Sequence, residues 1–290
     1  MPAMQHNPFA SYHPAVAFTL LVCAAAFAMA AMQPVYVALS LAGSLACSAC
    51  VRGARRTARQ LPWLAATICV VALANMLFAN EGETALFYLG PRAMRLEALW
   101  YGLCAGGMLA AVFTWMSSYA ACMDSAATTA LLGNVAPTIS LMVSQVMRLV
   151  PQFARRGRLV EDVAAAVPAA APRTARERVR GHLRTVSVLV GWGLDDSLGR
   201  SDAMRARGYG CGCRRTTYRR YHLGRADVTL LALIALLVAV NIPLAAIAVG
   251  QYTFYPAPPR LIVWWGYLPY AALMILPVVL TAREWLLWRR

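Results

Sequence analysis

The chain has 290 residues, of which 60% are apolar and 13% charged, whereas about half and about a quarter are usual in a soluble domain. This composition excludes an ordinary soluble enzyme and favours a protein embedded in a membrane. The formal net charge is +15. Because the chain is also rich in apolar residues, this charge favours an anionic membrane surface over nucleic acid as the partner. Every basic residue counted in that charge is an arginine. Because lysine is absent, a phosphate-binding loop ending in Gly-Lys-Ser/Thr and a Schiff-base lysine are both excluded.

A membrane helix needs about 20 predominantly apolar residues, and six segments of the sequence meet this need. Only the Gln33-Pro34 break separates the first two segments, which predicts a tight helical hairpin. Asn241 and Pro243 predict a kink in the fifth segment, whose freed backbone groups must find partners within the protein. The six predicted spans are 14–32, 34–51, 61–79, 98–121, 228–249 and about 261–282.

The distribution of arginine between the loops predicts the orientation of these spans. Loop 52–60 has four arginines and no acid, and the C-terminal end adds three more arginines, so both are expected in the cytoplasm. Segment 80–97 and loop 250–260 lack such an excess and are expected outside. This pattern predicts a multi-pass membrane protein with both termini cytoplasmic.

A long arginine-rich stretch lies between the fourth and fifth predicted spans. Residues 122–227 contain 17 arginines and eight acids, and loops of this length are usually functional or disordered. Apolar residues recur near helical spacing within 128–167 and again within 182–210, on either side of a low-complexity hinge at 168–181. These apolar residues are Leu141, Val143, Val146, Leu149 and Val150 in the first part, and Leu183, Val186, Leu189, Val190 and Leu194 in the second.

The predicted fold class is therefore all-α: a polytopic membrane protein with about six transmembrane helices and two long amphipathic cytoplasmic helices. Its predicted parts are membrane helices in 1–121, a cytoplasmic arm in 122–227 and two further membrane helices in 228–290. Two interpretations of the arm are open. Its helices either lie on the lipid bilayer with arginines toward the phosphates, or dock with their exposed ends on a separate cytoplasmic protein.

Several motifs follow one another along the chain in a recognisable order. "YHPAVAF" precedes the first span, "RLVP" runs from Arg148 to Pro151, and "AMRARGYG" ends the second amphipathic stretch. In this order, and with six spans, the sequence resembles the transmembrane T component of energy-coupling factor (ECF) transporters. The second of that family's two Ala-Arg-Gly signatures falls on Ala206, Arg207 and Gly208. At the place of the first signature the chain reads Ala166-Val167-Pro168, without the arginine and the glycine.

The resemblance implies a non-catalytic subunit that needs no cofactor of its own. It would transmit the motion of two cytoplasmic ABC-type ATPase subunits to a small membrane S component, which binds a vitamin or transition-metal ion. Because the S component binds the substrate, the sequence of this chain does not predict which substrate is transported. Each of the two coupling helices would end in a groove of one ATPase subunit. The residues implied as coupling-helix elements are Arg148, Pro151 and Ala166.

The ATPase contact implied by the second signature centres on Arg207, with Arg205 beside it. A planar guanidinium group can hold a carboxylate through two hydrogen bonds, which a lysine cannot do as well. Ala206 keeps the neighbouring surface small, and Gly208 is expected to end the helix in a left-handed conformation.

Other patterns were weighed against this interpretation. The small residues of span 98–121 permit close helix contact, either within the chain or with the S component. The cysteines and histidines lack the spacing of a metal site, and the adjacent Asp195 and Asp196 should face different sides of a helix. The alternative functions are a multispan membrane enzyme acting on a lipid or isoprenoid, and a membrane anchor for a cytoplasmic complex. The small residues are Gly102, Gly106, Gly107, Ala110 and Ala111.

Overall fold

The computed structural model describes residues 9, 12–79, 84–89, 92–124, 127–131, 137–166, 174–212, 221–254 and 264–288. The chain divides into two compact units. The first, the membrane unit, combines Met1–Thr128 with Tyr221–Arg290, and the second, the arm, is Thr129–Arg220. Because the arm is one continuous segment, it is joined to the membrane unit at both of its ends.

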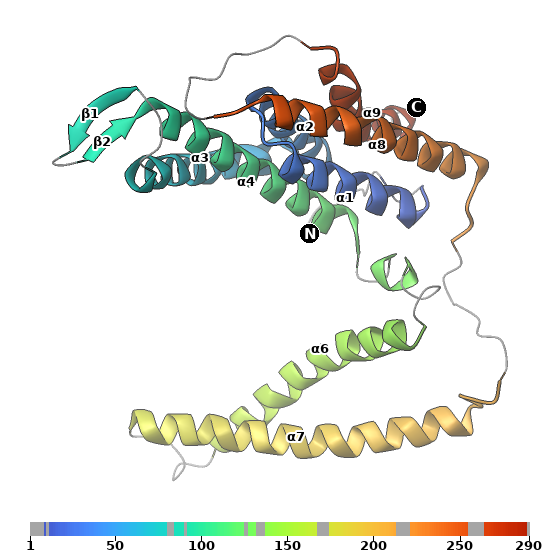
Figure 1. Ribbon diagram of the computed structural model, residues 1–290. Helices are drawn as coiled ribbons and strands as arrows, with labels where there is room; N and C mark the ends of the chain where they lie inside the picture. The colour runs from blue at the N-terminus through green and yellow to red at the C-terminus, as the bar shows by residue number, and fades with distance from the viewer. Residues whose placement is uncertain are drawn as a thin grey trace. The chain divides into compact units, whose positions relative to one another are not determined.

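Apolar helices make up most of the membrane unit (Figure 1). Among the described residues, α2, α3, α4 and α8 are each long and apolar enough to cross a membrane, and α1 is a shorter apolar helix. The chain is therefore a helical, polytopic membrane protein, and the predicted fold class is confirmed. The helices are α1 (Pro14–Ala30), α2 (Pro34–Arg52), α3 (Ala54–Phe78), α4 (Leu96–Cys122), α8 (Arg225–Gln251) and α9 (Tyr267–Trp288).

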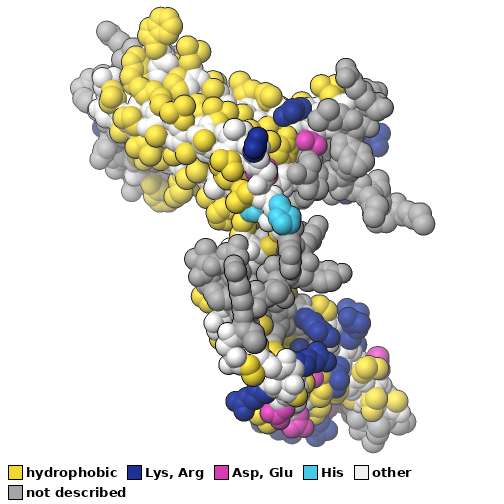
Figure 2. Space-filling model, turned by 90° about the vertical axis from the view of Figure 1, so that its right-hand side faces the viewer, with side chains coloured by type: hydrophobic (Ala, Val, Ile, Leu, Met, Phe, Trp, Pro, Cys, Tyr) yellow, Lys and Arg dark blue, Asp and Glu magenta, His cyan; other side chains and the backbone are white. Residues whose placement is uncertain are grey.

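Large apolar side chains cover the outside of the membrane unit (Figure 2). Phe78 of α3 is 79% exposed, and Val70 of α3 and Leu236 of α8 are also exposed. In water, a contiguous apolar surface of this kind would be unfavourable. In a bilayer the same side chains are solvated by lipid tails, which is what the apolar composition predicts.

Buried aromatic residues form much of the core where α2, α4 and α9 meet. The ring of Tyr36 lies 4.5 Å from that of Tyr270, centroid to centroid, and its hydroxyl donates to the carbonyl oxygen of Gly266 over 3.3 Å. Trp115 of α4 is fully buried, and its indole nitrogen donates to the hydroxyl oxygen of Ser40 over 3.2 Å. Tyr36 and Trp115 each combine a large buried area with a hydrogen-bonded polar atom, which suits the interior of a membrane protein.

The starts of α1, α3 and α8 and the ends of α2, α4 and α9 lie at one face of the membrane unit, as the contacts between their end residues show. We call it the Arg52 face. Arg52, the last residue of α2, donates to the side chain of Gln60 near the start of α3 over 2.9 Å, and also to Ser117 near the end of α4. The ring of Phe18, in the first turns of α1, contacts Tyr119 of α4 edge to face. Alternate helices therefore run in opposite directions, as successive membrane crossings require.

Asp227 joins the starts of α1 and α8 at the same face. One carboxylate oxygen accepts from the backbone N–H of His13 over 3.2 Å, and the other accepts from that of Gly224 over 3.0 Å. His13 in turn caps α1, because its Nδ1 accepts from the backbone N–H of Ala15. Nearby, burial raises the pKa of the Tyr12 hydroxyl, and the Glu284 carboxylate, in the last two turns of α9, raises it further.

The small residues of α4 pack within the chain. A Cβ atom added to Gly102 would lie 2.7 Å from the Cα of Ala72, and one added to Gly106 would lie 2.8 Å from the Cα of Ile68. Gly107 lies against Val37 of α2, and Ala110 and Ala111 are buried. Of the two uses predicted for these residues, the structure displays close packing of α4 against α2 and α3.

Asn241 links α8 to α9. Its side-chain nitrogen donates to the carbonyl oxygen of Leu237 over 2.8 Å and to that of Pro269 over 3.2 Å. Helix α8 continues through Pro243. The buried side-chain amide of Asn241, two residues before this proline, makes the contacts within the protein. Such a bridge between two membrane helices is favourable because the amide N–H groups of Asn241 find acceptors within the protein.

Three boundaries differ from the sequence predictions. The predicted loop 52–60 is helical except at Gly53, whose φ of 89° interrupts the helix between α2 and α3. The rest of this segment is helical because arginine favours helix. Segment 80–97 contains an antiparallel hairpin, β1 (Ala85–Leu89) with β2 (Arg92–Arg95), which pairs Phe87 with Met94. The last predicted span lies several residues further along, since α9 begins only after the Trp265-Gly266 turn.

The arm consists mainly of two long helices, α6 (Pro137–Ala165) and α7 (Ala175–Ala206), after a short helical segment at 127–131. The predicted hinge 168–181 is partly wrong, because α7 already begins at Ala175. Thr174 accepts from the backbone N–H of Glu177, and the Glu177 side chain accepts from that of Thr174. This capping box starts the helix inside a sequence rich in alanine and arginine. The rest of the hinge, 168–173, lies outside the described residues.

We predict that Gly106→Ala destabilises the membrane unit. The new methyl group would meet the α3 backbone, so the helices must separate, which costs about 1–3 kcal/mol. Thermal unfolding of the purified protein in detergent should show a lower midpoint. Gly250→Ala is the matched control, since its Cβ would meet nothing within 4 Å. Equal midpoints for the two variants would contradict the close contact.

Candidate functional site

The two arm helices pack as an antiparallel pair. Gly157 of α6 lies against Leu189 of α7, and Gln145 of α6 donates to the sulfur of Met204 over 3.5 Å. At the far end, Glu161 lies 3.4 Å from His182, measured from carboxylate oxygen to Nδ1. Rising residue numbers on α6 thus meet falling numbers on α7. The C-terminal ends of α6 and α7 therefore lie at opposite ends of the pair (Figure 1).

A cluster of aromatic rings marks the middle of this pair. The rings of Phe153 and Trp192 lie 5.3 Å apart in an edge-to-face arrangement, and the guanidinium of Arg156 stands 3.6 Å from the Trp192 ring. Gly193 leaves room for Phe153, whose ring would lie only 2.7 Å from an added Cβ atom. Aromatic and cation–π contacts of this kind each contribute about 1 kcal/mol. They are the most specific contacts between α6 and α7.

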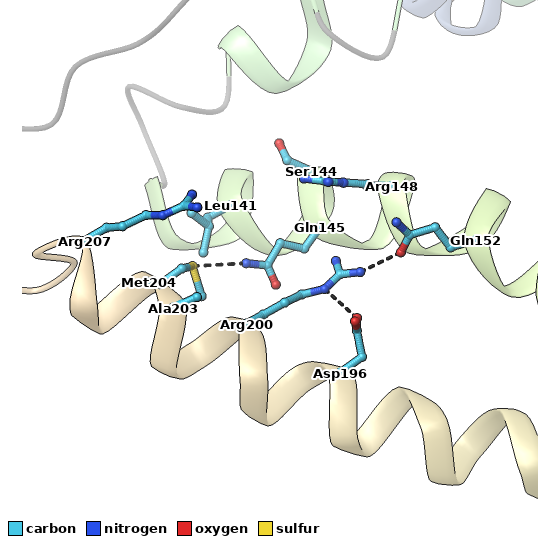
Figure 3. Close-up of a pocket in the computed structure, with 10 residues that line it drawn as sticks. All are labelled: Leu141, Ser144, Gln145, Arg148, Gln152, Asp196, Arg200, Ala203, Met204 and Arg207. Carbon is cyan, nitrogen blue, oxygen red and sulfur yellow. Dashed lines mark hydrogen bonds and ion pairs between the residues drawn. The ribbon is translucent and has the colours of Figure 1, made fainter.

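An open groove of about 560 Å³ lies between the two helices toward the C-terminal end of α7. Its lining combines apolar side chains with polar and basic ones (Figure 3). Three arginines, Arg148, Arg200 and Arg207, share it with a single carboxylate, Asp196. The remaining lining residues are Leu141, Ser144, Gln145, Gln152, Ala203 and Met204.

One of the three groove arginines is already engaged. The Nε of Arg200 lies 2.5 Å from a carboxylate oxygen of Asp196, and an Nη of Arg200 donates to the side-chain oxygen of Gln152 over 2.6 Å. Within the described part of the chain, Arg148 and Arg207 make no such ion pair. The groove therefore presents two uncompensated guanidinium groups, which suit a carboxylate or another anion.

Arg148 and Arg207 belong to different predicted motifs, yet both line this groove. Figure 3 shows Arg207 reaching from the end of α7 toward Leu141 of α6, while Arg148 lies along α6 beside Ser144. The structure thus brings together two arginines that are 59 positions apart in the sequence. The other predicted residues of the second motif, Arg205 and Ala206, are exposed at the end of α7.

Gly208 ends α7 in the predicted way. Its φ of 85° is the left-handed value that favours glycine. The backbone N–H of Gly208 donates to the carbonyl of Arg205, and that of Tyr209 donates to the carbonyl of Met204. This pair of hydrogen bonds is a Schellman motif. It stops the helix directly after Arg207, so the arginine stands at the helix end.

The predicted first motif lies elsewhere on the pair. Ala166 forms an exposed turn just after α6, at the opposite end from Arg207, and Val167 and Pro168 lie outside the described residues. Pro151, the last residue of the "RLVP" motif, lies inside α6, where its exposed carbonyl accepts from Arg155 over 3.4 Å. Helix α6 continues past this proline to Ala165.

Most of the apolar residues predicted to pattern the two helices do not face the partner helix. Leu141, Leu149 and Leu189 are half-buried, but the other seven predicted positions are exposed. Side chains that are polar or small fill the seam instead, among them Gln145, Gln152 and Gly157. These residues have no recognisable signal in the sequence, because a polar seam between two helices leaves no apolar periodicity. The Asp196–Arg200 ion pair could have been predicted from its spacing of four residues. Asp195 is exposed while Asp196 faces the groove, so the two carboxylates lie on different sides of the helix, as predicted.

Comparison with known proteins adds no assignment to this site. No protein-family model matches the chain, and no curated protein matches it significantly. Among the described residues, no group of three or more histidine, cysteine, aspartate or glutamate side chains is arranged to hold a metal ion. The chemistry that the groove offers is therefore the recognition of an anion by Arg148 and Arg207.

We predict that Trp192→Ala loosens the helix pair. Removing this half-buried ring deletes contacts with both Phe153 and Arg156, which should cost about 2 kcal/mol. Hydrogen exchange measured by mass spectrometry should become faster along α6 and α7. Trp265→Ala, at an 84% exposed position of the membrane unit, should leave exchange in the arm unchanged. Equal exchange in the two variants would contradict the role of the ring cluster.

We also predict that Gly208→Ala frays the end of α7. The new side chain has open space, so the cost is backbone strain of about 1 kcal/mol at a left-handed φ. Hydrogen exchange at the backbone amides of positions 208 and 209 should accelerate roughly fivefold. In Gly199→Ala, at an interior position of α7 that is also open, exchange should not accelerate, because alanine favours helix. Unchanged exchange in Gly208→Ala would refute the cap.

Proposed function

We propose that this chain is the transmembrane coupling subunit, or T component, of an ECF-type importer in a bacterial plasma membrane. Its arm would lie in the cytoplasm and bind two ABC-type ATPase subunits. A small membrane S component would bind the transported vitamin or transition-metal ion. The chain itself would have no catalytic site, since the ATP chemistry belongs to the ATPase subunits.

The observation that carries this proposal is the capped end of α7. The Schellman motif at Gly208 holds Arg207 at the end of a 32-residue helix, and Arg207 has no ion-pair partner in the described part of the chain. A guanidinium in this position is available to a carboxylate of a partner protein. The sequence motif around it is the one by which the chain resembles T components.

The geometry of the arm also supports the transmission of motion. Helix α7 is about 48 Å long at 1.5 Å per residue, and its end lies opposite that of α6. Partners bound at the two ends would act on opposite ends of one helix pair. The seam is narrow, since Thr185, which is 9% exposed, is the one residue of α7 that is buried. The helices can therefore shift relative to each other at modest cost.

The orientation proposed for the chain places the Arg52 face in the cytoplasm. Arg52, Arg55, Arg56 and Arg59 surround the α2–α3 junction at this face. Arginine near the ends of membrane helices favours the cytoplasmic side. Both ends of the arm connect to helices that end or begin at the same face, namely α4 and α8.

The decisive experiment is a pull-down of the ATPase subunits by the full chain carrying Arg207→Glu. We expect affinity to fall at least roughly thirtyfold, because charge reversal places two carboxylates against each other. Arg207→Lys should fall by a smaller factor, roughly tenfold, because an ammonium group loses the bidentate contact. Substrate uptake in cells should fall in parallel.

The matched control is Arg155→Glu, which reverses an exposed arginine within α6, away from both ends of the helix pair. This variant changes the net charge equally and should bind the ATPases almost normally. All variants are first compared by thermal unfolding, to establish that each is folded. Undiminished ATPase binding and uptake by Arg207→Glu would refute the assigned role of Arg207.

A further inference from the structure

A row of aliphatic side chains on α7 has no partner in the arm. Val179, Leu183, Val186 and Val190 are each at least 54% exposed. Their spacing of four, three and four residues places them on one side of the helix. We call these four residues the α7 stripe.

Most of the α7 stripe faces away from α6, and Val186 lies at its edge, where it lines an open groove with Gly157 and Leu189. Thr185 and Leu189 are among the residues that α6 covers, and each directly precedes a stripe residue, Val186 and Val190. Consecutive residues on an α-helix are rotated by about 100°. The stripe therefore lies about a quarter-turn away from the seam, on a side that α6 leaves open.

Arginines flank the stripe on its other side. Arg180 directly follows Val179, and Arg184 directly follows Leu183, so each lies a further rotation of about 100° from the seam. Arg176 falls on the same ridge, four residues before Arg180. The order around the helix is thus seam, aliphatic stripe, arginine ridge.

This end of the arm is also strongly basic as a whole. Described residues 155–166 and 174–184 contain seven arginines against three carboxylates, a local excess of four positive charges. One of those carboxylates, Glu177, is engaged in the capping box of α7. Another, Glu161, is paired with His182. Figure 2 shows arginines gathered on the arm, in contrast to the apolar face of the membrane unit.

We propose that the α7 stripe and its arginine ridge bind the surface of an anionic lipid bilayer. An aliphatic face bordered by arginines is the pattern of a helix that lies in the membrane interface. The arginine stems pack along the apolar boundary while the guanidinium groups reach the phosphates. The apolar residues of the stripe are only valine and leucine, which are under-represented among the hot spots of protein interfaces.

The covalent connection of the arm strengthens this inference. Both ends of the arm continue into helices of the membrane unit, so the stripe is held at a high effective concentration near the bilayer. A weak interfacial affinity is then sufficient for binding. Without this tether, a single helix with four aliphatic residues would bind lipid only marginally.

The test uses the full chain reconstituted in nanodiscs without any ATPase. A cysteine-free variant receives either Val190→Cys or Asp195→Cys, and a fluorophore that responds to water is attached there. Position 195 is the matched control, since it is exposed on the same helix but lies on a different side from the stripe. The nanodiscs contain either phosphatidylcholine alone or a mixture with phosphatidylglycerol, each with and without brominated lipid.

In the mixture with phosphatidylglycerol, brominated lipid should quench the label at position 190 and leave position 195 unaffected. Arg180→Gln and Arg184→Gln should each lower the ratio of bound to free arm by roughly fivefold, and phosphatidylcholine alone should lower it further. If the cysteine-free chain does not fold, a photoreactive benzoyl-phenylalanine at the same two positions, in the native cysteine background, reports lipid contact by crosslinking.

Three results would overturn the proposal. The label at position 190 remains in water, it is shielded from water without being quenched by lipid, or its quenching is independent of lipid charge. The second result would indicate contact with protein, including another copy of the chain. Because no ATPase is present, any of these results leaves the role proposed for Arg207 untouched, and failure of Arg207→Glu leaves the lipid contact untouched.

Discussion

The seam between α6 and α7 constrains everything else in the arm. It is centred on one ring pair, Phe153 and Trp192, and its other contacts come mainly from small and polar side chains, including the Glu161–His182 pair. A seam of this kind needs few apolar residues, so most valines and leucines of both helices remain outside it. Because the seam is also polar, it leaves a groove with uncompensated arginines at one end. The candidate site and the outer stripe are thus two consequences of the same packing.

The membrane unit follows a different physical rule. Apolar burial gives no net preference for helix contact in lipid, so glycines that let backbones approach closely hold α4 against α3. At the Arg52 face, the polar contacts of Arg52 and Asp227 tie helix ends together. Asp227 holds the backbone at the point where the arm re-enters the unit, since α8 starts there. Movement of the arm would therefore reach the first turns of α1 and α8 directly.

The sequence predicted what depends on local chemistry and failed where tertiary pairing decides. Apolar length identified the membrane helices, and the glycine after Arg207 identified the end of α7. The early start of α3 was missed because one residue, Gly53, separates α2 from α3 where the loop 52–60 was predicted. The hairpin β1–β2 was missed because its strands have only four or five residues each. The meeting of Arg148 with Arg207 depends on the register of two antiparallel helices. No local pattern contains that register, because apolar residues do not mark the seam.

The two ends of the helix pair are chemically unequal, and this limits how partners can bind. One end carries the groove, with Arg148 and Arg207 unpaired in the described residues. At the other end Glu161 and His182 pair with each other, and the turn at Ala166 offers a methyl group instead of a guanidinium. At the signature positions themselves, a carboxylate on a partner would meet a guanidinium group at the first end and a methyl group at the second, where exposed arginines such as Arg176 and Arg178 lie on α7 instead. Under the proposed function, the two ATPase subunits would therefore meet chemically different surfaces at the two ends.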